Sequence, residues 1–569
     1  ALPICLMQLV AYGAQDVYLT GNPQITFWKV TYRRHTNFSL ESIEQTFNGQ
    51  ADFGRRVTCT ISRNGDLAYR TYLQVTLPEI NQGMIHTGPA TETHGVFARW
   101  LDCPGEQLIS QVEVEIGGQR IDRQYGDWMH IWNQLTLSAE QEVGYNKMIG
   151  NTTQLTYITD PSFSNVDGPC DADGPRQVCA PRNALPETTL YVPLQFWYCR
   201  NPGLALPLIA LQYHEVKINL DLRPIDEFLW AVNNLSCTLN NSKASTTGSV
   251  KVTTAYNQSL VAASLYVDYV FLDTDERRRM AQNPHEYLIE QLQFTGDESV
   301  GSSSNKIKLN FNHPCKELIW VVQPDENVDY CSSLECGSHL YTLLGAQPFN
   351  YTDAVDVLPN AIHAYGGPEA VAGPGNTEGF VNRYGAFADP GAEDVGHQAG
   401  QAWPYVSAGG GSNPPDMTDG EYWNGGGTGG FGNTGDTSTV SDAGTFVLSE
   451  CALMKHCWGE NPVVTAKLQL NGQDRFSERE GTYFDLVQPF QHHTRSPDTG
   501  VNVYSFALRP EEHQPSGTCN FSRIDSATLQ LVLSNATVEG TKTAKVRVYA
   551  TNYNVLRVMS GMGGLAYSN

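Results

Sequence analysis

The sequence predicts an all-β protein made of two tandem antiparallel β domains, and three observations carry this prediction. The chain has 569 residues, whereas a single hydrophobic core stops growing at about 250–300 residues. Aromatic residues reach 10%, charged residues only 17%, and Gly and Pro number 52 and 30, a composition typical of strands and turns. Four segments of the first half also return in the same order in the second half, which indicates duplication.

The first repeated segment is SIEQTFNG at 42–49, which matches LIEQLQFTG at 288–296. An alternating run follows each copy, RVTCTIS in the first half and KIKLNFN in the second. A period of two places every second side chain on one face of a strand. The residues expected on that buried face are Val57, Cys59, Ile61, Ile307, Leu309 and Phe311.

The second repeated segment is EIGGQRIDRQYGDW at 115–128, which matches QLNGQDRFSEREGTYF at 469–484. Both copies contain Gly-Gln, then Arg with an apolar neighbour, and then a glycine, Gly126 or Gly481. An aromatic residue, Trp128 or Tyr483, stands two positions after that glycine. We therefore expect equivalent corners of two duplicated domains, with Trp128 and Tyr483 in corresponding places.

Two further pairs complete the repeat, 201–220 with 514–533 and 264–273 with 545–553. Short alternating strands separated by Gly, Pro and Asn turns predict antiparallel sandwiches or barrels rather than parallel βαβ units. Helical patterns are few. One begins at Ser138, where Ser138 and Gln141 would form a capping box, and another begins at Asp273 between the two copies.

The expected organisation has five parts and two insertions. In chain order it comprises an N-terminal arm (1–24), a first β domain (25–273) with an insertion at about 150–188, a linker helix (274–287), a second β domain (288–555) with an insertion at about 325–445, and a C-terminal tail (556–569). The second insertion is rich in glycine and acidic residues, and Arg383 is the single basic residue of 366–444. Such a composition buries too little apolar surface to form its own core.

Charge and hydropathy exclude several classes of function. The net charge of −24 is unsuited to nucleic-acid binding, which requires stripes of Lys and Arg. The apolar opening ALPICLMQLVAYG is far shorter than the roughly 20 residues of a membrane span and lacks a basic start. The 13 scattered cysteines predict free thiols in a reducing compartment, although Cys331 with Cys336, or Cys170 with Cys179, would pair in an oxidising one.

No motif predicts a catalytic, cofactor or metal site, so we expect no enzyme. The string GTGGFG at Gly427–Gly432 lacks the strand and helix that a phosphate-binding loop requires. Cys451, His456 and Cys457, with help from His492-His493, lack the paired spacing of a zinc knuckle. His214 alternates with strand residues and is interpreted as a structural polar group.

Sequons for N-glycosylation are about as frequent as chance in a chain this rich in Asn, Ser and Thr. Asn151 and Asn350 stand in the predicted insertions, where a glycan would reach solvent. They are therefore the two candidate glycosylation sites.

Long blocks across nearly the whole chain carry a resemblance to a known family. These blocks are LVAYGAQDVYLTGNPQITFWKVTYRRHTNF (9–38), TISRNGDL (60–67), EIGGQRID (115–122), NPGLALPLIALQYHEVK (201–217), PHEYLIEQLQFTG (284–296), LNGQDRF (470–476), QPSGTCNFSRID (514–525) and NYNVLRVMSGMGGLAY (552–567). In them the chain resembles the major capsid proteins of large nucleocytoplasmic DNA viruses, and the algal chlorovirus members above all.

This resemblance implies a double jelly roll, two eight-stranded sandwiches side by side in one chain. It further implies a homotrimer with a pseudo-hexagonal outline that tiles an icosahedral virion shell, assembled in the host cytoplasm. The implied partners are neighbouring capsomers and minor capsid and penton proteins, with no direct nucleic acid and only indirect contact with an inner membrane. The alternative is a lectin-like, carbohydrate-binding β-sandwich, since lectins share the architecture.

Overall fold

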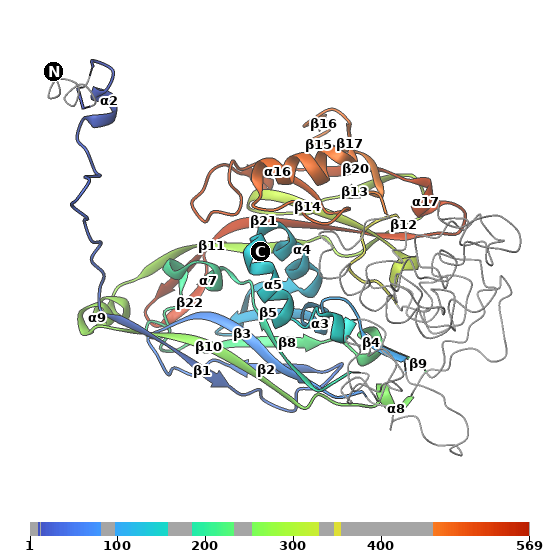
Figure 1. Ribbon diagram of the computed structural model, residues 1–569, viewed down its shortest axis with the longest axis horizontal. Coiled ribbons are helices and arrows are strands. Elements are labelled where there is room, and N and C mark those ends of the chain that lie inside the picture. Colours follow the sequence, from blue (N-terminus) through green and yellow to red (C-terminus); the bar gives the residue numbers. More distant parts are fainter. Residues whose placement is uncertain are drawn as a thin grey trace, which may run out of the picture.

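A computed structural model of the chain describes residues 10–11, 13–80, 97–156, 185–232, 253–328, 346–353 and 459–567. The described part consists of antiparallel sheets with short helices between their strands (Figure 1). Two β domains lie side by side, and an extended N-terminal arm leads away from them (Figure 1).

The first jelly roll contains two four-stranded sheets. One has the order β1 (Phe38–Gln45), β10 (Ala262–Leu272), β3 (Leu67–Leu77) and β7 (Thr188–Pro193). The other has the order β2 (Arg56–Thr60), β8 (Val216–Leu222), β5 (Ile109–Ile116) and β6 (Gln119–Tyr125). A separate two-stranded ribbon pairs β4 (Phe97–Trp100) with β9 (Leu229–Val232).

The second jelly roll repeats this arrangement. One sheet has the order β11 (His285–Phe294), β21 (Ala544–Met559), β14 (Pro314–Pro324) and β18 (Asn502–Ser505). The other sheet has the order β13 (Ser304–Lys308), β20 (Ala527–Leu533), β15 (Val463–Leu470) and β16 (Gln473–Asp474). Short strands extend these sheets: β12 (Glu298–Val300) and β22 (Met562–Leu565) pair with β21, β19 (Cys519–Asn520) with β14, and β17 (Arg479–Glu480) with β15. The four-strand paths follow the same chain order in both rolls, first-eighth-third-sixth and second-seventh-fourth-fifth. The predicted all-β, double jelly-roll fold is confirmed.

The alternating strands bury the faces that the sequence predicted. Val57, Cys59, Ile61, Ile307, Leu309 and Phe311 are all buried. The strands of the third repeat behave in the same way, since Val216, Ile218, Leu220, Leu529, Leu531 and Leu533 are buried. Burying one such side chain contributes about 1.5–3 kcal/mol, so a one-residue slip of register would be strongly unfavourable.

Two helices lie near the predicted positions, with differences in detail. Helix α9 (Thr274–Gln282) joins the two rolls, and the Asp273 side chain accepts a hydrogen bond from the Thr274 amide at its start. Helix α5 (Ala139–Met148) begins after Ser138, but the Ser138 side chain makes no capping hydrogen bond. The predicted capping box is therefore wrong.

Other helices arise in the connections between strands. They are α2 (Val17–Thr20), α3 (Pro104–Leu108), α4 (Gly126–Thr136), α6 (Thr153–Thr156), α7 (Trp197–Arg200), α8 (Thr253–Tyr256), α16 (Gln488–His492) and α17 (Asn535–Val538), with a π-helical turn, η6, at Tyr483–Val487. In both rolls, helical segments follow the fifth strand: α4 and α5 in the first roll, η6 and α16 in the second.

The termini differ from the predicted organisation. The first strand begins at Phe38, and residues 17–37 before it are exposed, so the arm reaches beyond residue 24. Residues 556–565 continue β21 and form β22, which pair as a hairpin, where the sequence predicted a tail. The first insertion falls in the connection between β6 and β7, and the second in the connection between β14 and β15. Most of both insertions lies outside the described residues.

Candidate functional site: the interface between the jelly rolls and the exposed arm

The two jelly rolls share a buried apolar core, which we call the inter-roll interface. The first roll contributes Cys103, Trp128, Ile131, Trp132, Leu135, Tyr145 and Ile149, and the second Ile319, Val321, Phe349, Tyr351, Val501, Val503 and Tyr549. The rings of Trp128 in α4 and Tyr549 in β21 lie 5.4 Å apart. Because α4 is apolar on the face toward the second roll, this helix fixes one roll against the other.

Ion pairs border the inter-roll interface. Arg547 of β21 lies 2.8 Å from Asp127 of α4 and 2.8 Å from Asp297. Burial alone would lower the pKa of Arg547, but Asp127 together with Tyr549, Tyr351 and Asp297 outweighs it and raises that pKa. Arg495 of the second roll also lies 2.6 Å from Glu142 of α5. Partly buried pairs of this kind fix orientation more than they add stability.

Asp122 of β6 is a buried carboxyl at the edge of the same interface. It accepts a hydrogen bond from the backbone amide of Leu292 in β11, at 3.1 Å. Its neighbour Ile121 accepts a hydrogen bond from the Gln291 side chain. Burial raises the pKa of Asp122 to about 7, although the Leu292 amide and Arg200 act in the opposite direction. The carboxyl is thus poised between its neutral and charged forms.

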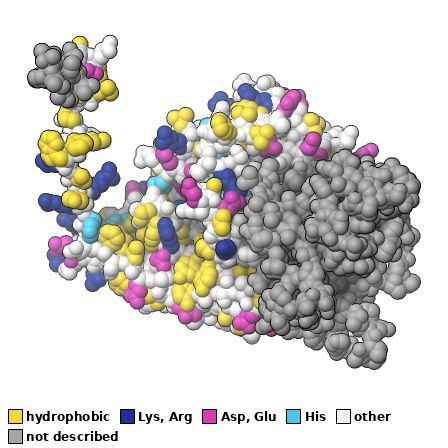
Figure 2. Space-filling model, viewed as in Figure 1, with side chains coloured by type: hydrophobic (Ala, Val, Ile, Leu, Met, Phe, Trp, Pro, Cys, Tyr) yellow, Lys and Arg dark blue, Asp and Glu magenta, His cyan; other side chains and the backbone are white. Residues whose placement is uncertain are grey.

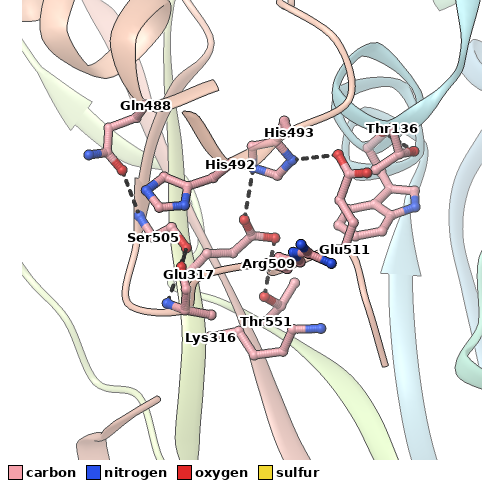
Figure 3. A network of polar contacts seen from close by, with 12 residues as sticks. Thr136, Lys316, Glu317, Gln488, His492, His493, Ser505, Arg509, Glu511 and Thr551 are labelled. Atoms are coloured by element: carbon pink, nitrogen blue, oxygen red, sulfur yellow. Dashed lines mark hydrogen bonds and ion pairs between the residues drawn. The ribbon is translucent and has the colours of Figure 1, made fainter. Parts of the chain in front are cut away.

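His493 is the centre of a second buried polar group, which lies within the second roll (Figure 3). Its ring lies between two carboxylates, 3.0 Å from Glu317 of β14 and 2.9 Å from Glu511. Burial alone would lower the pKa of His493, but Glu317 and then Glu511 raise it to about 9. A cationic imidazole therefore holds the chain just after α16 against the central sheet.

The arm, defined as residues 13–37, projects from the body beside α9 and carries α2 at its far end (Figure 1). Large apolar side chains along it are exposed, among them Tyr18 at 93% and Trp28 at 83%. Residues 21–37 contain the basic residues Lys29, Arg33 and Arg34 and no acidic residue. Figure 2 shows hydrophobic and basic side chains side by side along this arm. Exposed apolar surface on an extended segment marks an interaction site.

The two predicted corner residues occupy related places in their rolls. Trp128 lies in the first turn of α4 and Tyr483 opens η6, and both segments follow the fifth strand. The glycine before each is tightly packed: a Cβ on Gly126 would lie 2.2 Å from the Ile109 carbonyl oxygen, and one on Gly481 would lie 1.8 Å from that of Val463. Ile109 and Val463 are the first residues of β5 and β15.

The side chains of these two corner residues pack differently. Trp128 contacts the other roll through Tyr549, whereas Tyr483 packs on Phe484 and under the guanidinium of Arg479 within its own roll. Equivalence of the two positions after optimal superposition of the rolls stays a prediction.

The two predicted glycosylation residues lie in contrasting surroundings. Asn151 is half-buried just before α6, and its amide donates to Asn146 Oδ1 at 3.3 Å. Asn350 is completely buried, and its side chain donates to Gln347 and accepts from Thr352. A glycan on Asn350 would have to displace this packed network, so its burial argues against glycosylation there. Glycosylation of Asn151 or Asn350 stays a prediction.

The remaining sequence candidates have structural roles or lie outside the described residues. Gly427–Gly432, Cys451, His456 and Cys457 fall outside them. The Nδ1 atom of His214 lies 3.1 Å from the Gly563 amide, so this histidine joins the first roll to β22. Among the described residues, Cys59, Cys199, Cys315 and Cys519 are free thiols. No helix in the described ranges has the length and apolar character to cross a membrane.

Sequence reasoning missed the groups that join the two rolls. Asp127 and Arg547 are far apart in the chain, as are Glu142 and Arg495, and no local pattern links them. The sequence signal that was available is the apolar face of 126–136, where Trp128, Ile131, Trp132 and Leu135 recur at helical spacing. That spacing predicts a helix with a buried face, but it does not say that the face meets the other roll.

Comparisons with known proteins agree with this architecture. A family model described as large eukaryotic DNA virus major capsid protein matches residues 276–564, and one described as major capsid protein N-terminus matches residues 26–273. The major capsid protein of Chrysochromulina ericina virus is 73% identical, with 99% of each chain covered. That of Paramecium bursaria Chlorella virus 1 is 37% identical, again with 99% of each covered. A quasi-atomic model of the PBCV-1 virus capsid matches with a TM-score of 0.57 and 32% identity, covering 96% of this chain and 100% of that chain.

Two topologically identical jelly rolls joined by a shared core define a structural protein of the double jelly-roll class. The chain belongs to the major capsid proteins of large eukaryotic DNA viruses. Its function is that of a structural capsid protein, and it forms the shell of the virion. The resemblance predicted from the sequence is confirmed, and the comparisons favour it over the lectin-like alternative.

Proposed function

We propose that three copies of this chain form a capsomer with a pseudo-hexagonal outline, and that these capsomers tile an icosahedral shell. One observation carries this proposal: two rolls of the same strand order are fixed side by side through the inter-roll interface. A three-fold assembly of such pairs presents six similar wedges around its axis, and closed cyclic symmetry uses one interface three times. The outline then suits a hexagonal lattice.

An exposed apolar patch on the second roll suits the contact between subunits. Leu486, Phe490 and Leu508 are 54%, 82% and 74% exposed. The first two lie at helical spacing across η6 and α16, and the His492 ring contacts the Leu508 carbonyl oxygen at 3.2 Å. Obligate interfaces are more apolar than ordinary surface, so this patch is a suitable part of the trimer contact.

Mass in solution tests the trimer directly. Light scattering of the purified chain should give about 188 kDa, three times the 62.7 kDa of one chain, with no dissociation on dilution. A monomeric mass at all concentrations would contradict the proposal.

The arm suits contacts between capsomers and with minor capsid and penton proteins. It is apolar and basic, while the whole chain has a net charge of −24, so acidic neighbouring surfaces complement it. We further propose assembly in the host cytoplasm, a purely structural role without catalysis, and contact with an inner membrane only through other proteins. The acidic balance also argues against direct nucleic-acid binding, and a filter-binding assay at low salt tests this point.

A further inference from the structure

Three side chains able to bind a metal ion converge in the first roll, a group that we call the thiol cluster. Cys103 immediately precedes α3, Glu106 lies within α3, and His130 lies in α4. Cys103 Sγ, a carboxylate oxygen of Glu106 and a ring nitrogen of His130 all lie within 4.8 Å of one another. All three residues are at least 96% buried, which distinguishes them from a chance group of surface acids.

A cavity of about 20 Å³ lies beside the thiol cluster. Cys103, Glu106 and His130 line it together with Asn133 and Tyr145. A space of roughly 10–15 Å³, measured in the same way, holds one water molecule. The cavity therefore has room for a single ion or water, and it is far too small for an organic substrate. A hydrolytic Cys-His-Glu triad is disfavoured for this reason.

The surroundings hold Glu106 in one orientation. Its Oε1 atom accepts hydrogen bonds from the Tyr145 hydroxyl at 2.5 Å and from the Asn133 amide at 3.0 Å. Its Oε2 atom lies 2.7 Å from His130 Nδ1. Partners that orient a carboxylate in this way are typical of the second layer of groups around a bound metal.

The backbone of Cys103 supplies a further observation. Its φ of 49° and ψ of 61° place it in the left-handed region, where glycine or asparagine is the ordinary residue. A cysteine in this conformation is strained. Strained residues of this kind are concentrated at binding sites.

We propose that Cys103, Glu106 and His130 bind one divalent transition-metal ion, for which Zn²⁺ fits best. Thiolate, imidazole and carboxylate are the three ligand types of protein zinc sites, and three protein ligands plus one water is a common set. That water would occupy the adjacent cavity, which Asn133 and Tyr145 line as potential hydrogen-bond partners. Binding replaces the thiol proton of Cys103 by a zinc–sulfur bond. It also replaces the proton held between His130 and Glu106 by bonds from those two groups to zinc, and both protons leave to solvent.

The rearrangement that binding requires is small. Ligand atoms around tetrahedral zinc at 2.0–2.2 Å are about 3.3–3.6 Å apart. The 2.7 Å contact between His130 and Glu106 must therefore open by roughly 0.6–0.9 Å. The cavity beside them provides that space. The ring of Phe349, from the second roll, stacks on His130 with centroids 4.1 Å apart. The ion would thus fix α3 to α4 directly beneath the inter-roll interface.

Cobalt substitution tests the site, because a thiolate bound to Co²⁺ gives a charge-transfer band in the near ultraviolet. The full-length protein is stripped with a chelator, dialysed and titrated with Co²⁺ and then Zn²⁺. We expect one equivalent per chain to produce the band, Zn²⁺ to displace it, and Zn²⁺ to raise the melting temperature. Cys103→Ser should lose the band and the thermal shift.

Matched variants separate the thiol cluster from other cysteines and histidines. Cys199→Ser removes another buried thiol, and His493→Gln removes another buried histidine that lies between carboxylates; both should keep the band. Glu106→Gln keeps the size of the side chain and its hydrogen-bond acceptor, so it should fold. It should weaken Zn²⁺ binding by more than about 100-fold, because loss of an orienting contact alone weakens binding by 10–100-fold.

The result that overturns the proposal is a wild-type protein with no thiolate–cobalt band, or a band that Cys103→Ser leaves unchanged. If Cys103→Ser does not fold, the comparison of wild type with Glu106→Gln decides, and equal Zn²⁺ affinity of the two contradicts the proposal. X-ray absorption of the zinc-loaded wild type gives an independent measurement: one sulfur ligand supports the site, and none refutes it.

Discussion

At the residue scale, Gly126 and Gly481 show how a repeated sequence turn becomes a repeated structural corner. Each glycine lies against the carbonyl of the first residue of the fourth strand of its own roll. The repeat of glycine and aromatic residue in the two halves identified these positions from the sequence. It did not reveal that the reason is close packing against backbone, since that contact joins residues distant in the chain.

Replacing either glycine by alanine should destabilise its roll. The added Cβ would lie 2.2 Å from the Ile109 carbonyl oxygen in Gly126→Ala and 1.8 Å from the Val463 oxygen in Gly481→Ala, and overpacking of this kind costs about 1–3 kcal/mol or more. The control is Gly144→Ala in α5, where nothing lies within 4 Å of the added Cβ. It should be neutral or stabilising by up to about 1 kcal/mol. Chemical unfolding of the three variants measures the difference, and equal stabilities would contradict the packing argument.

His493 should make the stability of the second roll depend on pH. Its pKa is raised from 6.5 to about 9 in the folded protein, so its contribution is complete below pH 6.5, falls as pH rises, and is lost above pH 9. The shift corresponds to about 3 kcal/mol. His493→Gln should therefore be less stable than wild type at pH 6 and should flatten the decline between pH 6.5 and 9.

Unfolding measured at several pH values tests this dependence. His285→Gln serves as the control, because the His285 ring bonds to the Met280 carbonyl rather than to a pair of carboxylates. If the free energy of unfolding of the wild type stays constant from pH 6.5 to 9, the predicted contribution of His493 is contradicted.

The glycosylation candidates show that a sequence motif does not reveal whether its asparagine is accessible. Asn350 satisfies the acceptor pattern, but its side chain is buried and hydrogen-bonded to Gln347 and Thr352. Intact-mass and peptide analysis of protein purified from virions should therefore find the peptide that contains Asn350 unmodified. A glycan at Asn350 would require that the packing around Thr352 be different in the virion.

At the scale of elements, strands were far more predictable than helices. Alternation in 56–62 and 306–312 predicts β2 and β13 because one face of each strand meets an apolar core. Helices α4 and α5 were not anticipated as a unit, since their position depends on contacts with the other roll. The arm was predicted to end at residue 24, yet the exposed segment reaches residue 37. Its alternating apolar residues resemble a strand, but they lack a partner sheet within the described part of the chain.

Deletion of residues 1–20 should leave a folded trimer that assembles poorly. The described residues of this segment make no buried contact with the body, so stability and trimer mass should match wild type. Assembly into shells, followed by electron microscopy, should fall because the apolar contacts of this segment are lost. A second variant, Phe27→Ser with Trp28→Ser, tests exposed side chains in the part of the arm that this deletion leaves. Loss of folding in either protein would place the arm in the core instead.

At the scale of the whole molecule, the fold followed from the duplication and the family resemblance, while the joint between the rolls did not. Two similar halves in tandem predict two similar domains, but they do not specify which faces meet. The structure places α4, α5 and the 493–495 segment at that joint, through pairs such as Arg547 with Asp127. The residues adjacent in sequence to Arg547 or Asp127 give no indication that these two side chains meet.

A charge placed on the exposed patch of the second roll should break the trimer and spare the fold. Phe490→Asp introduces a carboxylate where the side chain is 82% exposed in the single chain, so folding should be unaffected. A buried unpaired charge in an interface costs several kcal/mol, and light scattering should therefore show monomers. Tyr213→Asp, which changes another exposed aromatic residue on the first roll, is the control. Trimers of normal mass for Phe490→Asp would exclude this patch from the contact.

The unequal packing of the two corner residues has a consequence for the lattice. Trp128 faces the sister roll while Tyr483 stays within its own, so the halves share a topology without being interchangeable. In the trimer proposed above, the two kinds of roll would alternate around the axis. A capsomer turned by one sixth of a revolution would then keep its outline but exchange the two rolls at every edge, so the proposed capsomer has an orientation as well as a shape.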